Sequence, residues 1–385
     1  MSDLVFSASN LSGTITLPQT KSAIIRELLL NALSGNEPTR VVHLTDNVCD
    51  DIRHAYSACN YVKNYNSKCD TIEVGESATL LRLMVPVMLS KYGLVRFHVK
   101  PSLFNRPVSQ FAESLECQIR CEGVDTLCFS DMKKKSLYTV DCSISSQFAS
   151  GMLLALPFLP KSTMDVGEHT VSKPYFELTL QLMESYGISI KKIGTKYQYD
   201  GGTFITPYAL PSFPDFSYAA NYIVANQFGS SVTFSNFCTD VIVPDSNITA
   251  LLRQSVINIS DTPDLFPILA VSACSKIEKT TFIGTKRLRT KESDRIAAVT
   301  NGIHALGGEA IVYDDYVEIH GHGNLHGGII DSRSDHRIVM AFAIASLLCN
   351  GSVAILDADS VSKSAPQFFD DFIKLGGKID EYIRP

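Results

Sequence analysis

The residues best suited to chemistry in this chain form one short polar segment. From Thr290 to Arg295 the sequence reads TKESDR, six charged or hydroxylic side chains that directly precede the apolar residues 296–299. In a helix, Lys291 and Arg295 would lie on one face, where like charges repel unless an anion or a carboxylate lies between them. Glu292, three residues before Arg295, can supply that carboxylate. The segment predicts a site that handles anions and protons, and a solvated helix start capped by Thr290 is the alternative.

Basic side chains are also concentrated at other points of an acidic chain. The formal net charge is −6, which argues against general affinity for nucleic acid or for an anionic membrane. Eight basic residues nevertheless stand at predicted helix starts or in loops: Lys21, Arg26, Arg82, Arg106, Lys291, Arg295, Arg337 and Lys363. Any one of them could belong to an ordinary ion pair, but their joint placement predicts a small substrate with more than one anionic group.

These residues are attached to a pattern that occurs six times along the chain. Polar or hydroxylic residues begin each unit, an apolar helix follows, and in several units a β-branched run comes next. Most of these helices are apolar around their whole circumference, which predicts that they are buried and that their polar starts meet solvent or ligand. The predicted helices are 24–33, 80–89, 148–156, 218–225, 265–274 and 338–349.

Strands and a second set of helices complete the units. Strands are predicted at 40–44, 94–99, 231–234, 280–283 and 352–356, and amphipathic helices at 108–119, 175–186, 295–306 and 367–375. Glycine follows the last three of these helices, where a helix C-terminus needs a left-handed residue. The alternation predicts an α/β protein. Buried helices whose polar starts face one place would gather backbone N–H groups into an anion site.

Length, cysteine usage and hydropathy bound the class of protein. A chain of 385 residues is too long for one ordinary core, and the proline-rich stretch PYALPSFP at 207–214 marks the predicted domain boundary. Ten cysteines without a C-x-x-C pair indicate reduced thiols, so we expect no disulfide. There is no signal-peptide pattern, and the longest apolar run is shorter than the ~20 residues of a membrane span, which predicts a cytoplasmic protein. His320, His322 and His326 lie in a glycine-rich turn without a nearby thiol, which favours an exposed loop over a metal site.

Eight motifs, taken in order, resemble the 5-enolpyruvylshikimate-3-phosphate (EPSP) synthase family over essentially the whole chain. KESDR together with DHR is highly specific, whereas the other motifs would be weak alone. They are Leu17 to Ser22 with Arg26, Asn105-Arg106-Pro107, Ser145-Ser146-Gln147, Ser172 to Tyr175, Pro263-Asp264, Lys291 to Arg295, Asp335-His336-Arg337 and Lys363. The resemblance implies a two-domain inside-out α/β barrel of six βαβαββ pseudo-repeats, three per domain. The implied domains are 20–214 and 1–19 plus 215–385.

The resemblance also implies an activity. Members of the family transfer the enolpyruvyl group of phosphoenolpyruvate to the 5-hydroxyl of shikimate 3-phosphate and release phosphate, a step toward chorismate and the aromatic amino acids. No metal and no organic cofactor is implied, the only partners are the two small-molecule substrates, and a monomer is expected. The first domain would mainly bind shikimate 3-phosphate, and the second would carry the catalytic carboxylates and the cations for phosphoenolpyruvate.

Residue roles follow from the resemblance, position by position. The catalytic groups would be Asp264, Glu292, Lys291 and Lys21. Shikimate 3-phosphate would be bound by Lys21, Ser22, Arg26, Ser145, Ser146, Gln147, Ser172, Tyr175, Asp264 and Lys291. Phosphoenolpyruvate would be bound by Lys21, Ala78, Arg106, Gln147, Arg295, His336, Arg337 and Lys363. For Ser145 and Ser172, ordinary N-capping is an equally good interpretation when either is seen alone.

The chemistry explains why these residue types are needed. Phosphoenolpyruvate is a stable enol ester, so its C3 must be protonated while the attacking hydroxyl loses its proton. An acid and a base are therefore required. Glu292 and Asp264 are the carboxylates, and Lys291 is a further candidate for proton transfer. Which group acts in which half-reaction stays open at this point.

Two places depart from the family pattern. The turn Pro18-Gln19-Thr20-Lys21 lacks the glycine that is usual in the family, so its backbone must turn without glycine's freedom. In 75–79, which read GESAT, Ala78 replaces a glycine that in the family lies against phosphoenolpyruvate, and its methyl group predicts reduced inhibition by glyphosate. Glu76 places a carboxylate near an anionic substrate, which should weaken binding unless Glu76 pairs with Arg82 or Lys21.

Two alternatives are weighed against this function. The UDP-N-acetylglucosamine enolpyruvyl transferases carry a reactive cysteine in the loop ahead of the Arg-Pro pair, and the corresponding loop here, 101–107, has none. A non-catalytic binding protein on the same scaffold would explain Gln19, Glu76 and Ala78. Against that alternative, every charged residue expected to do chemistry is present.

Overall fold

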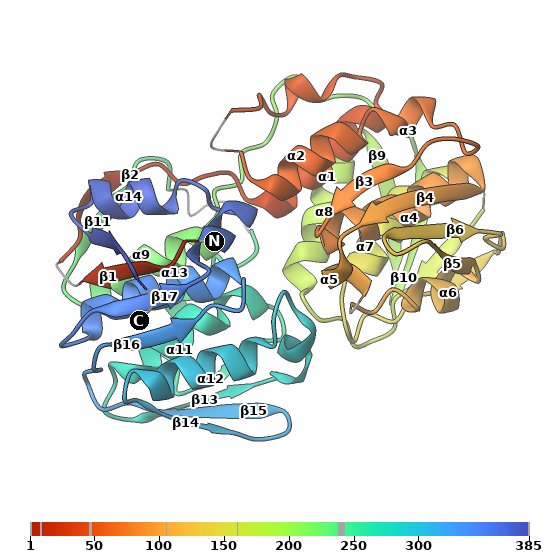
Figure 1. The fold of residues 1–385 in the computed structure, drawn as a ribbon. Helices are drawn as coiled ribbons and strands as arrows, with labels where there is room; N and C mark the ends of the chain where they lie inside the picture. The colour runs from red at the N-terminus through yellow and green to blue at the C-terminus, as the bar shows by residue number, and fades with distance from the viewer. Residues whose placement is uncertain are drawn as a thin grey trace. The chain divides into compact units, whose positions relative to one another are not determined.

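A computed structural model of the chain describes residues 2–7, 10–45, 48–104, 106–159, 161–237 and 243–383. The chain divides into two compact units. The terminal unit consists of Met1–Gln19 and Phe213–Pro385, and the central unit is Thr20–Ser212. Each unit contains both helices and strands (Figure 1). The assignment of one substrate mainly to each domain stays a prediction.

The central unit holds the first eight α-helices. They are α1 (Lys21–Leu33), α2 (Asp50–Ala58), α3 (Tyr61–Asn64), α4 (Ala78–Tyr92), α5 (Pro101–Phe104), α6 (Gln110–Leu115), α7 (Gln147–Ala155) and α8 (Lys173–Ser185), with 3₁₀ helices η1 (Pro38–Arg40) and η2 (Leu156–Phe158). Its strands are β3 (Ile72–Gly75), β4 (Leu94–Val99), β5 (Gln118–Glu122), β6 (Thr126–Ser130), β7 (Leu137–Thr139), β8 (Thr163–Asp165), β9 (Ile188–Ile193) and β10 (Lys196–Gly202).

The terminal unit combines the first strands of the chain with residues 213–385. Its helices are α9 (Phe216–Gln227), α10 (Ile248–Leu251), α11 (Phe266–Cys274), α12 (Arg295–Ala305), α13 (His336–Ala345) and α14 (Phe368–Lys374), with η3 (Pro263–Leu265), η4 (Lys286–Thr290), η5 (Ser346–Leu348) and η6 (Ala358–Lys363). Its strands are β1 (Leu4–Ser7), β2 (Ser12–Ile15), β11 (Ser231–Phe234), β12 (Val256–Asn258), β13 (Lys279–Ile283), β14 (Glu309–Val312), β15 (Tyr316–His320), β16 (Gly328–Asp331), β17 (Val353–Leu356) and β18 (Lys378–Glu381).

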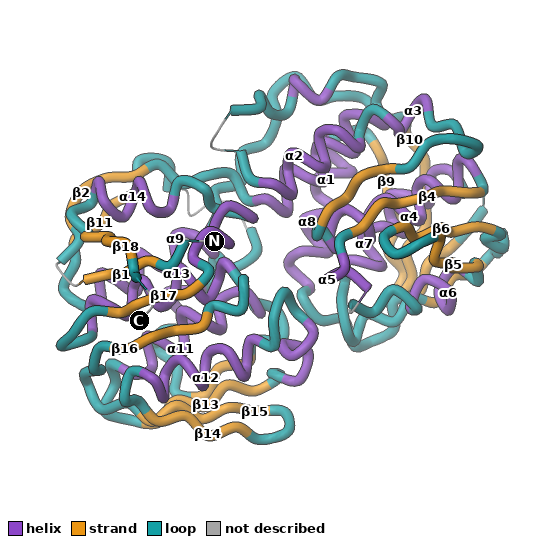
Figure 2. The backbone as a smooth tube through the Cα atoms, in the orientation of Figure 1, coloured by secondary structure: helices purple, strands orange, loops and turns teal. Residues whose placement is uncertain are grey.

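Four of the sheets share one topology. Their orders are β3-β4-β6-β5, β7-β8-β10-β9, β12-β13-β15-β14 and β16-β17-β1-β18. In each, the first pair is parallel and joined through a buried helix, and the remaining pairs are antiparallel. The predicted βαβαββ pattern is confirmed in these sheets. In the last one the N-terminal strand β1 lies between β17 and β18 and so completes the final repeat (Figure 2).

The other two predicted units depart from the pattern. Strands β2 and β11 form a parallel two-stranded sheet around α9. The strand predicted at 40–44 is wrong, because the described residues 34–45 and 48–71 contain η1, α2 and α3 and no strand. Pro38 starts the 3₁₀ turn, and its carbonyl accepts the N–H groups of Val41 (2.9 Å) and Val42 (3.2 Å), which a strand would donate to a neighbour.

The helix predicted at 108–119 is also too long. It ends at Leu115, where Glu116 has a left-handed φ of 45°, and Gln118 already begins β5. By contrast, the glycines predicted at helix C-termini have the expected left-handed conformation, with φ of 81° at Gly187, 79° at Gly307 and 100° at Gly376. Backbone turns marked by glycine were therefore easier to predict than the end at Glu116.

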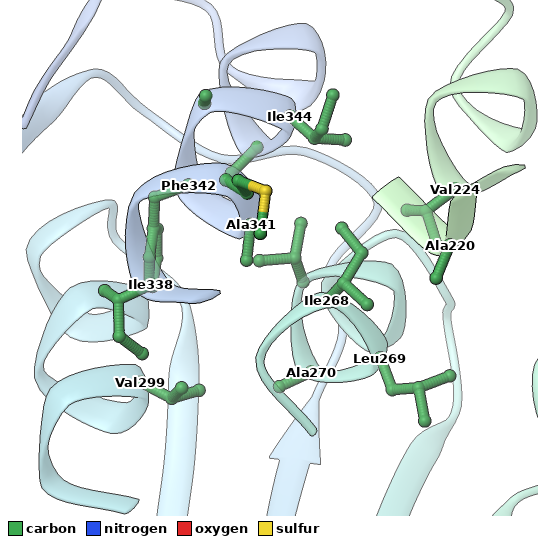
Figure 3. Packing of buried hydrophobic residues seen from close by; sticks show 14 of the residues in the cluster. Ala220, Val224, Ile268, Leu269, Ala270, Val299, Ile338, Ala341, Phe342 and Ile344 are labelled. Atoms are coloured by element: carbon green, nitrogen blue, oxygen red, sulfur yellow. The ribbon is translucent and has the colours of Figure 1, made fainter. Parts of the chain in front are cut away.

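The first helix of each repeat is buried, as its apolar circumference predicts. In the terminal unit α9, α11 and α13 pack on one another through residues such as Val224, Leu269 and Ile344, with Val299 of α12 beside them (Figure 3). In the central unit α4 packs on α7 at Gly151, where a Cβ atom would lie 2.1 Å from the carbonyl oxygen of Arg82. Only glycine allows these two helices to approach so closely.

The helix start in TKESDR differs from the prediction. Helix α12 begins at Arg295, and its N-cap is Asp294, whose Oδ1 accepts the N–H of Ala297 at 3.0 Å. Thr290 instead ends η4, where its hydroxyl donates to the carbonyl of Arg287. Lys291 has an extended backbone, so it does not share a helical face with Arg295. The prediction of one face for both cations is wrong because a stronger cap stands four residues after Thr290.

Three further expectations can be compared with the described residues. Nine cysteines are free thiols, and Cys238 lies outside the described part of the chain. Within that part, no helix is long and apolar enough to cross a membrane. The described side chains also contain no group of three or more His, Cys, Asp or Glu residues suited to a metal ion.

Glu27 in α1 makes the stability of the central unit depend on pH. The side chain is buried, with a residue exposure of 5%, and burial raises its pKa to about 8. The folded state therefore keeps a proton that the unfolded chain releases at the ordinary pKa of about 4.3, so stability is lost as pH rises from there through about 8.

We expect Glu27→Gln to raise thermal stability more at pH 8 than at pH 5, by roughly 3 kcal/mol, because the amide needs no proton. Thermal unfolding at the two pH values measures this. Glu113→Gln, at an exposed position of α6, is the control and should change nothing at either pH. Equal effects of Glu27→Gln at pH 5 and pH 8 would contradict the linkage.

Candidate active site

One buried guanidinium organises the polar cluster of the terminal unit. The side chain of Arg295 is 1% exposed. Its Nη1 lies 2.7 Å from Asp264 Oδ1, its Nη2 lies 2.7 Å from Glu292 Oε2, and its Nε lies 2.9 Å from Asp335 Oδ2. The predicted contact between Glu292 and Arg295 is confirmed. A single arginine thus holds three carboxylates that would otherwise repel one another.

Three helix starts position these carboxylates. Asp264 lies in η3 directly before α11, Glu292 lies in the loop before α12, and Asp335 is the N-cap of α13. Asp335 accepts the N–H of Arg337 at 2.9 Å and the hydroxyl of Ser293 at 3.1 Å. Because Asp335 caps one helix and pairs with the first residue of another, it fixes the distance between α12 and α13.

Asp264 is held in its ionised form. A second guanidinium, that of Arg337, lies 3.3 Å from its other oxygen, Oδ2. Burial acts to raise the pKa of Asp264, but Arg337, Arg295 and Lys291 together hold that pKa well below its usual range. At neutral pH Asp264 can therefore accept a proton or stabilise positive charge, and it has no proton to donate.

Lys291 is the group in this cluster that can change its charge near neutral pH. It is half-buried beside Asp264, Arg295 and Glu292. Burial is the main cause that lowers its pKa to about 7, and the carboxylate of Asp264 acts in the opposite direction. A lysine with such a pKa exists in both forms at pH 7, which suits proton transfer.

The remaining residues predicted for phosphoenolpyruvate in this unit lie at the start of α13. Arg337 and the buried His336 are its first two residues, and Lys363 Nζ donates to the carbonyl of Ser334 at 3.0 Å. The structure thus brings Arg337, His336 and Lys363 together. Arg295 lies deeper, with its guanidinium among carboxylates, and its predicted contact with substrate stays a prediction.

A second buried arginine connects the predicted residues of the central unit. Arg26, with an exposure of 1%, donates from Nη1 to the carbonyl of Ser22 (2.7 Å), from Nη2 to that of Tyr175 (3.2 Å) and from Nε to Thr179 Oγ1 (2.7 Å). Burial lowers its pKa to about 10, so the guanidinium remains charged at neutral pH. Here Arg26 joins α1 to α8 from the interior, and a direct contact with shikimate 3-phosphate stays a prediction.

The starts of α7 and α8 are joined by their serines. Ser146 Oγ donates to the carbonyl of Ser172 at 3.1 Å, and Ser172 has a left-handed φ of 52° directly before α8. Ser145 Oγ accepts the N–H of Gln147 at 3.3 Å, a local bond in the turn before α7, whereas the N-cap of this helix is Ser146. The sequence motifs at 145–147 and 172–175 are therefore adjacent in space.

Gln147 connects this group to the start of α4. Its Nε2 donates to Thr79 Oγ1 at 2.8 Å, and its Oε1 accepts from Arg82 Nη1 at 2.8 Å. The guanidinium of Arg82 also lies over the ring of Phe148, 4.9 Å from its centroid. These contacts fix the orientation of the Gln147 amide, with one N–H remaining for a ligand.

Three further predicted residues lie at element ends in the central unit. Lys21 begins α1 and pairs with Asp51 of α2 at 2.8 Å. Ala78 is the first residue of α4 and is buried. Arg106 is half-buried after α5, and its neighbour Asn105 in the Asn-Arg-Pro motif lies outside the described residues.

Sequence reasoning missed three residues that these clusters need. Asp335 was named in the motif Asp335-His336-Arg337 but given no role, although its place directly before His336 and Arg337 at a helix N-cap was the available signal. Thr79 could be noticed in the sequence only because it follows Ala78, and Asp51 only because it lies at the start of α2. Their partners, Gln147 and Lys21, are distant in sequence, and only the fold brings them together.

Comparisons with known proteins agree with this geometry. The family model described as "EPSP synthase (3-phosphoshikimate 1-carboxyvinyltransferase)" matches residues 5–242 and 239–372. The 3-phosphoshikimate 1-carboxyvinyltransferase of Clostridioides difficile (strain 630) is 30% identical over 435 residues, which cover 99% of each chain. That of Clostridium perfringens (strain 13 / Type A) is also 30% identical, over 99% of this chain and 100% of its own.

Solved structures show the same fold. An EPSP synthase from Acinetobacter baumannii has a TM-score of 0.74 at 20% identity, and the match covers 100% of both chains. The enolpyruvyl transferase NikO from Streptomyces tendae has a TM-score of 0.72 at 14% identity, again over 100% of both chains. The predicted two-domain α/β fold is thereby confirmed.

The position of Lys291 predicts unusual reactivity of its amine. With a pKa near 7, a large fraction of Lys291 is neutral at pH 7.5, whereas an ordinary lysine with a pKa of about 10.4 is almost fully protonated. We expect a small acylating reagent to modify Lys291 ahead of the exposed lysines. Mass spectrometry of the protein labelled across a pH series measures the midpoint for each lysine.

The variant Asp264→Asn tests whether the surroundings of Lys291 set its pKa. Because the Asp264 carboxylate raises the pKa of Lys291, its removal should move the labelling midpoint of Lys291 to lower pH and leave the exposed lysines unchanged. A midpoint for Lys291 that coincides with those of the exposed lysines would contradict the assignment.

Proposed function

The chain belongs to the EPSP synthase (3-phosphoshikimate 1-carboxyvinyltransferase) family, and we propose that it transfers the enolpyruvyl group of phosphoenolpyruvate to the 5-hydroxyl of shikimate 3-phosphate and releases phosphate. The observation that carries this proposal is the cluster around Arg295, which holds Asp264 and Glu292 beside a lysine that titrates near neutral pH. The reaction needs groups that donate and accept protons. Its product is a precursor of chorismate and of the aromatic amino acids.

The charges of the cluster suggest how protons are divided. Asp264 is ionised, so it accepts the proton of the attacking hydroxyl or stabilises the cationic centre that forms at C2. The proton for C3 then comes from one of the other catalytic candidates, Lys291, Glu292 or Lys21. Elimination of phosphate reverses these transfers, so each group must change protonation state within one turnover.

The substrates' anionic groups match the cations on the helix starts. We assign the phosphate and the carboxylate of phosphoenolpyruvate to Arg337, Lys363 and His336 in the terminal unit, and to Lys21, Arg106 and Gln147 in the central unit. Shikimate 3-phosphate is assigned to the serines at the starts of α7 and α8 with Tyr175 and Ser22. The start of a helix suits a phosphate because several N–H groups and the positive end of the helix dipole converge there. A cytoplasmic monomer is part of the same proposal.

Phosphate release from the purified protein tests the function. We expect release that requires both phosphoenolpyruvate and shikimate 3-phosphate. Glu292→Gln should lower kcat by about 10²- to 10⁴-fold, because it removes a proton-transfer group while preserving shape. Glu278→Gln, at an exposed position of the same unit, should leave kcat unchanged.

The same assay separates the alternatives. Release that depends on UDP-N-acetylglucosamine would make the protein the other enolpyruvyl transferase, although the loop 101–107 contains no cysteine. Absence of release with either acceptor, together with retained binding of the substrates, would establish the non-catalytic alternative.

Ala78 predicts the response to glyphosate. It is the buried first residue of α4, and the proposal places its methyl group against phosphoenolpyruvate. We expect the wild-type enzyme to be weakly inhibited and Ala78→Gly to lower the inhibitory concentration of glyphosate by about 10-fold or more, since one methyl group in a site changes affinity by that order. Ala112→Gly in α6 controls for the loss of a methyl group from a helix. Equal sensitivity of wild type and Ala78→Gly would sink the idea.

A further inference from the structure

A histidine in the central unit lies between two carboxylates. His98 is on β4, and its Nδ1 contacts a carboxylate oxygen of Glu73 on the neighbouring strand β3. Its Nε2 lies 3.0 Å from Oδ2 of Asp125, in the turn between β5 and β6. None of these three side chains belongs to the predicted catalytic or substrate-binding residues.

Glu73 connects this histidine to the start of α4. Its Oε1 accepts the N–H of Gly75 at 2.7 Å. Gly75 has a left-handed φ of 56°, and a Cβ atom there would lie 2.4 Å from Cε1 of His54 on α2. Glu73 thus fixes the turn through a hydrogen bond, and the His54 ring lies close against the Cα atom of Gly75. Ala78 follows three residues after this turn.

The geometry requires a particular protonation state of His98. Ionised carboxylates only accept hydrogen bonds, so both ring nitrogens must donate, which makes the ring an imidazolium. Glu73 and Asp125 correspondingly raise the pKa of His98 above its ordinary value. The His98 side chain is 41% exposed, so its protonation follows the pH of the solvent.

Two other basic residues lie on or next to β4, and each contacts a group other than the His98 ring. Arg96, on the same face of β4, pairs with Glu122 of β5 at 2.7 Å. Lys100 follows β4, and its backbone N–H donates to the carbonyl of Gly75 at 2.9 Å. On the opposite face, Val95, Phe97 and Val99 of β4 are buried. Glu73 and Asp125 are therefore the charges that decide the state of His98.

We propose that His98 is a positioning residue whose doubly protonated ring holds Glu73 against the Gly75 N–H, so that affinity for phosphoenolpyruvate falls when His98 loses a proton. This inference rests on the proposed function, which places Ala78 against phosphoenolpyruvate. A neutral ring presents a lone pair to one of the two carboxylates. In the tautomer that keeps its proton on Nε2, beside Asp125, Glu73 loses its partner and the turn from Gly75 to Ala78 is held less firmly.

The test compares KM for phosphoenolpyruvate in four proteins between about pH 6 and pH 9, a range that brackets an upward-shifted histidine pKa. His98→Phe keeps a ring on the strand but donates nothing, and Glu73→Gln can accept from Gly75 while donating to a neutral ring. Glu122→Gln is the matched control, because it breaks an ion pair on the same face that has no link to Gly75.

The informative quantity is the ratio of the wild-type KM to the KM of Glu73→Gln. Ionisation of the substrate and of Lys291 affects both proteins alike, so its contribution cancels in this ratio. We expect this ratio to rise about three- to tenfold between low and high pH, as expected for loss of one charge-assisted hydrogen bond. His98→Phe should have the high KM at every pH. The KM for shikimate 3-phosphate should not change, and Glu122→Gln should behave as wild type. A ratio that stays constant with pH would overturn the proposal.

A measurement without substrates separates this inference from the proposed function. In the free protein, NMR should show the Gly75 amide resonance titrating together with the His98 ring in wild type and not in Glu73→Gln. If the Gly75 resonance does not shift as His98 titrates, His98 does not hold the turn, whether or not the protein is catalytically active. If wild type releases no phosphate at any pH, the proposed function fails, and the Gly75 titration alone still decides whether His98 holds the turn.

Discussion

The buried ion cluster around Arg295 is the interaction on which the terminal unit depends. A guanidinium with almost no exposure is unfavourable unless buried acceptors take up its hydrogen bonds, and here the acceptors are Asp264, Glu292 and Asp335, which would repel one another without a cation between them. Each side of the cluster therefore requires the other. Because the three carboxylates come from three helix starts in two successive repeats, their attraction to one side chain also sets the positions of those helix starts. The repeat architecture is thus the means by which the proposed proton-transfer site is built.

The central unit also depends on a buried arginine, but the chemistry around it is different. Arg26 contacts carbonyl and hydroxyl groups, and burial without a carboxylate partner lowers its pKa, whereas the three carboxylates raise that of Arg295. The charge of Arg26 is thus not neutralised locally. It adds to the positive potential of the helix starts, which suits the proposed binding of shikimate 3-phosphate by this unit. The charge of Arg295 is neutralised by the three carboxylates of its cluster. Arg337 and Lys363 are therefore the cations placed to attract an anion at the start of α13.

Patterns that arise from local sequence were predictable, and contacts between distant residues were not. Strand β4 was predicted with its observed bounds, and the pairing of Glu292 with Arg295 followed from a spacing of three residues. The strand at 40–44 was wrong because Pro38 starts a turn that uses the N–H groups of Val41 and Val42. Asp335 was missed because its partner Arg295 lies 40 residues away, and no local pattern distinguishes a capping aspartate from one that also neutralises a buried arginine.

The departures from the family pattern differ in what they mean for catalysis. Gln19 replaces a glycine, yet it keeps a negative φ, and its side-chain oxygen accepts the N–H of Phe213 at 2.6 Å. That bond, together with the one from the Asp215 N–H to the Pro18 carbonyl at 2.8 Å, ties two chain segments that enter and leave the terminal unit. The substitution is therefore accommodated and gives no support to a decayed enzyme. Ala78 likewise adopts ordinary helical geometry as the first residue of α4, so its methyl group leaves the fold undisturbed and can act only on what binds beside it.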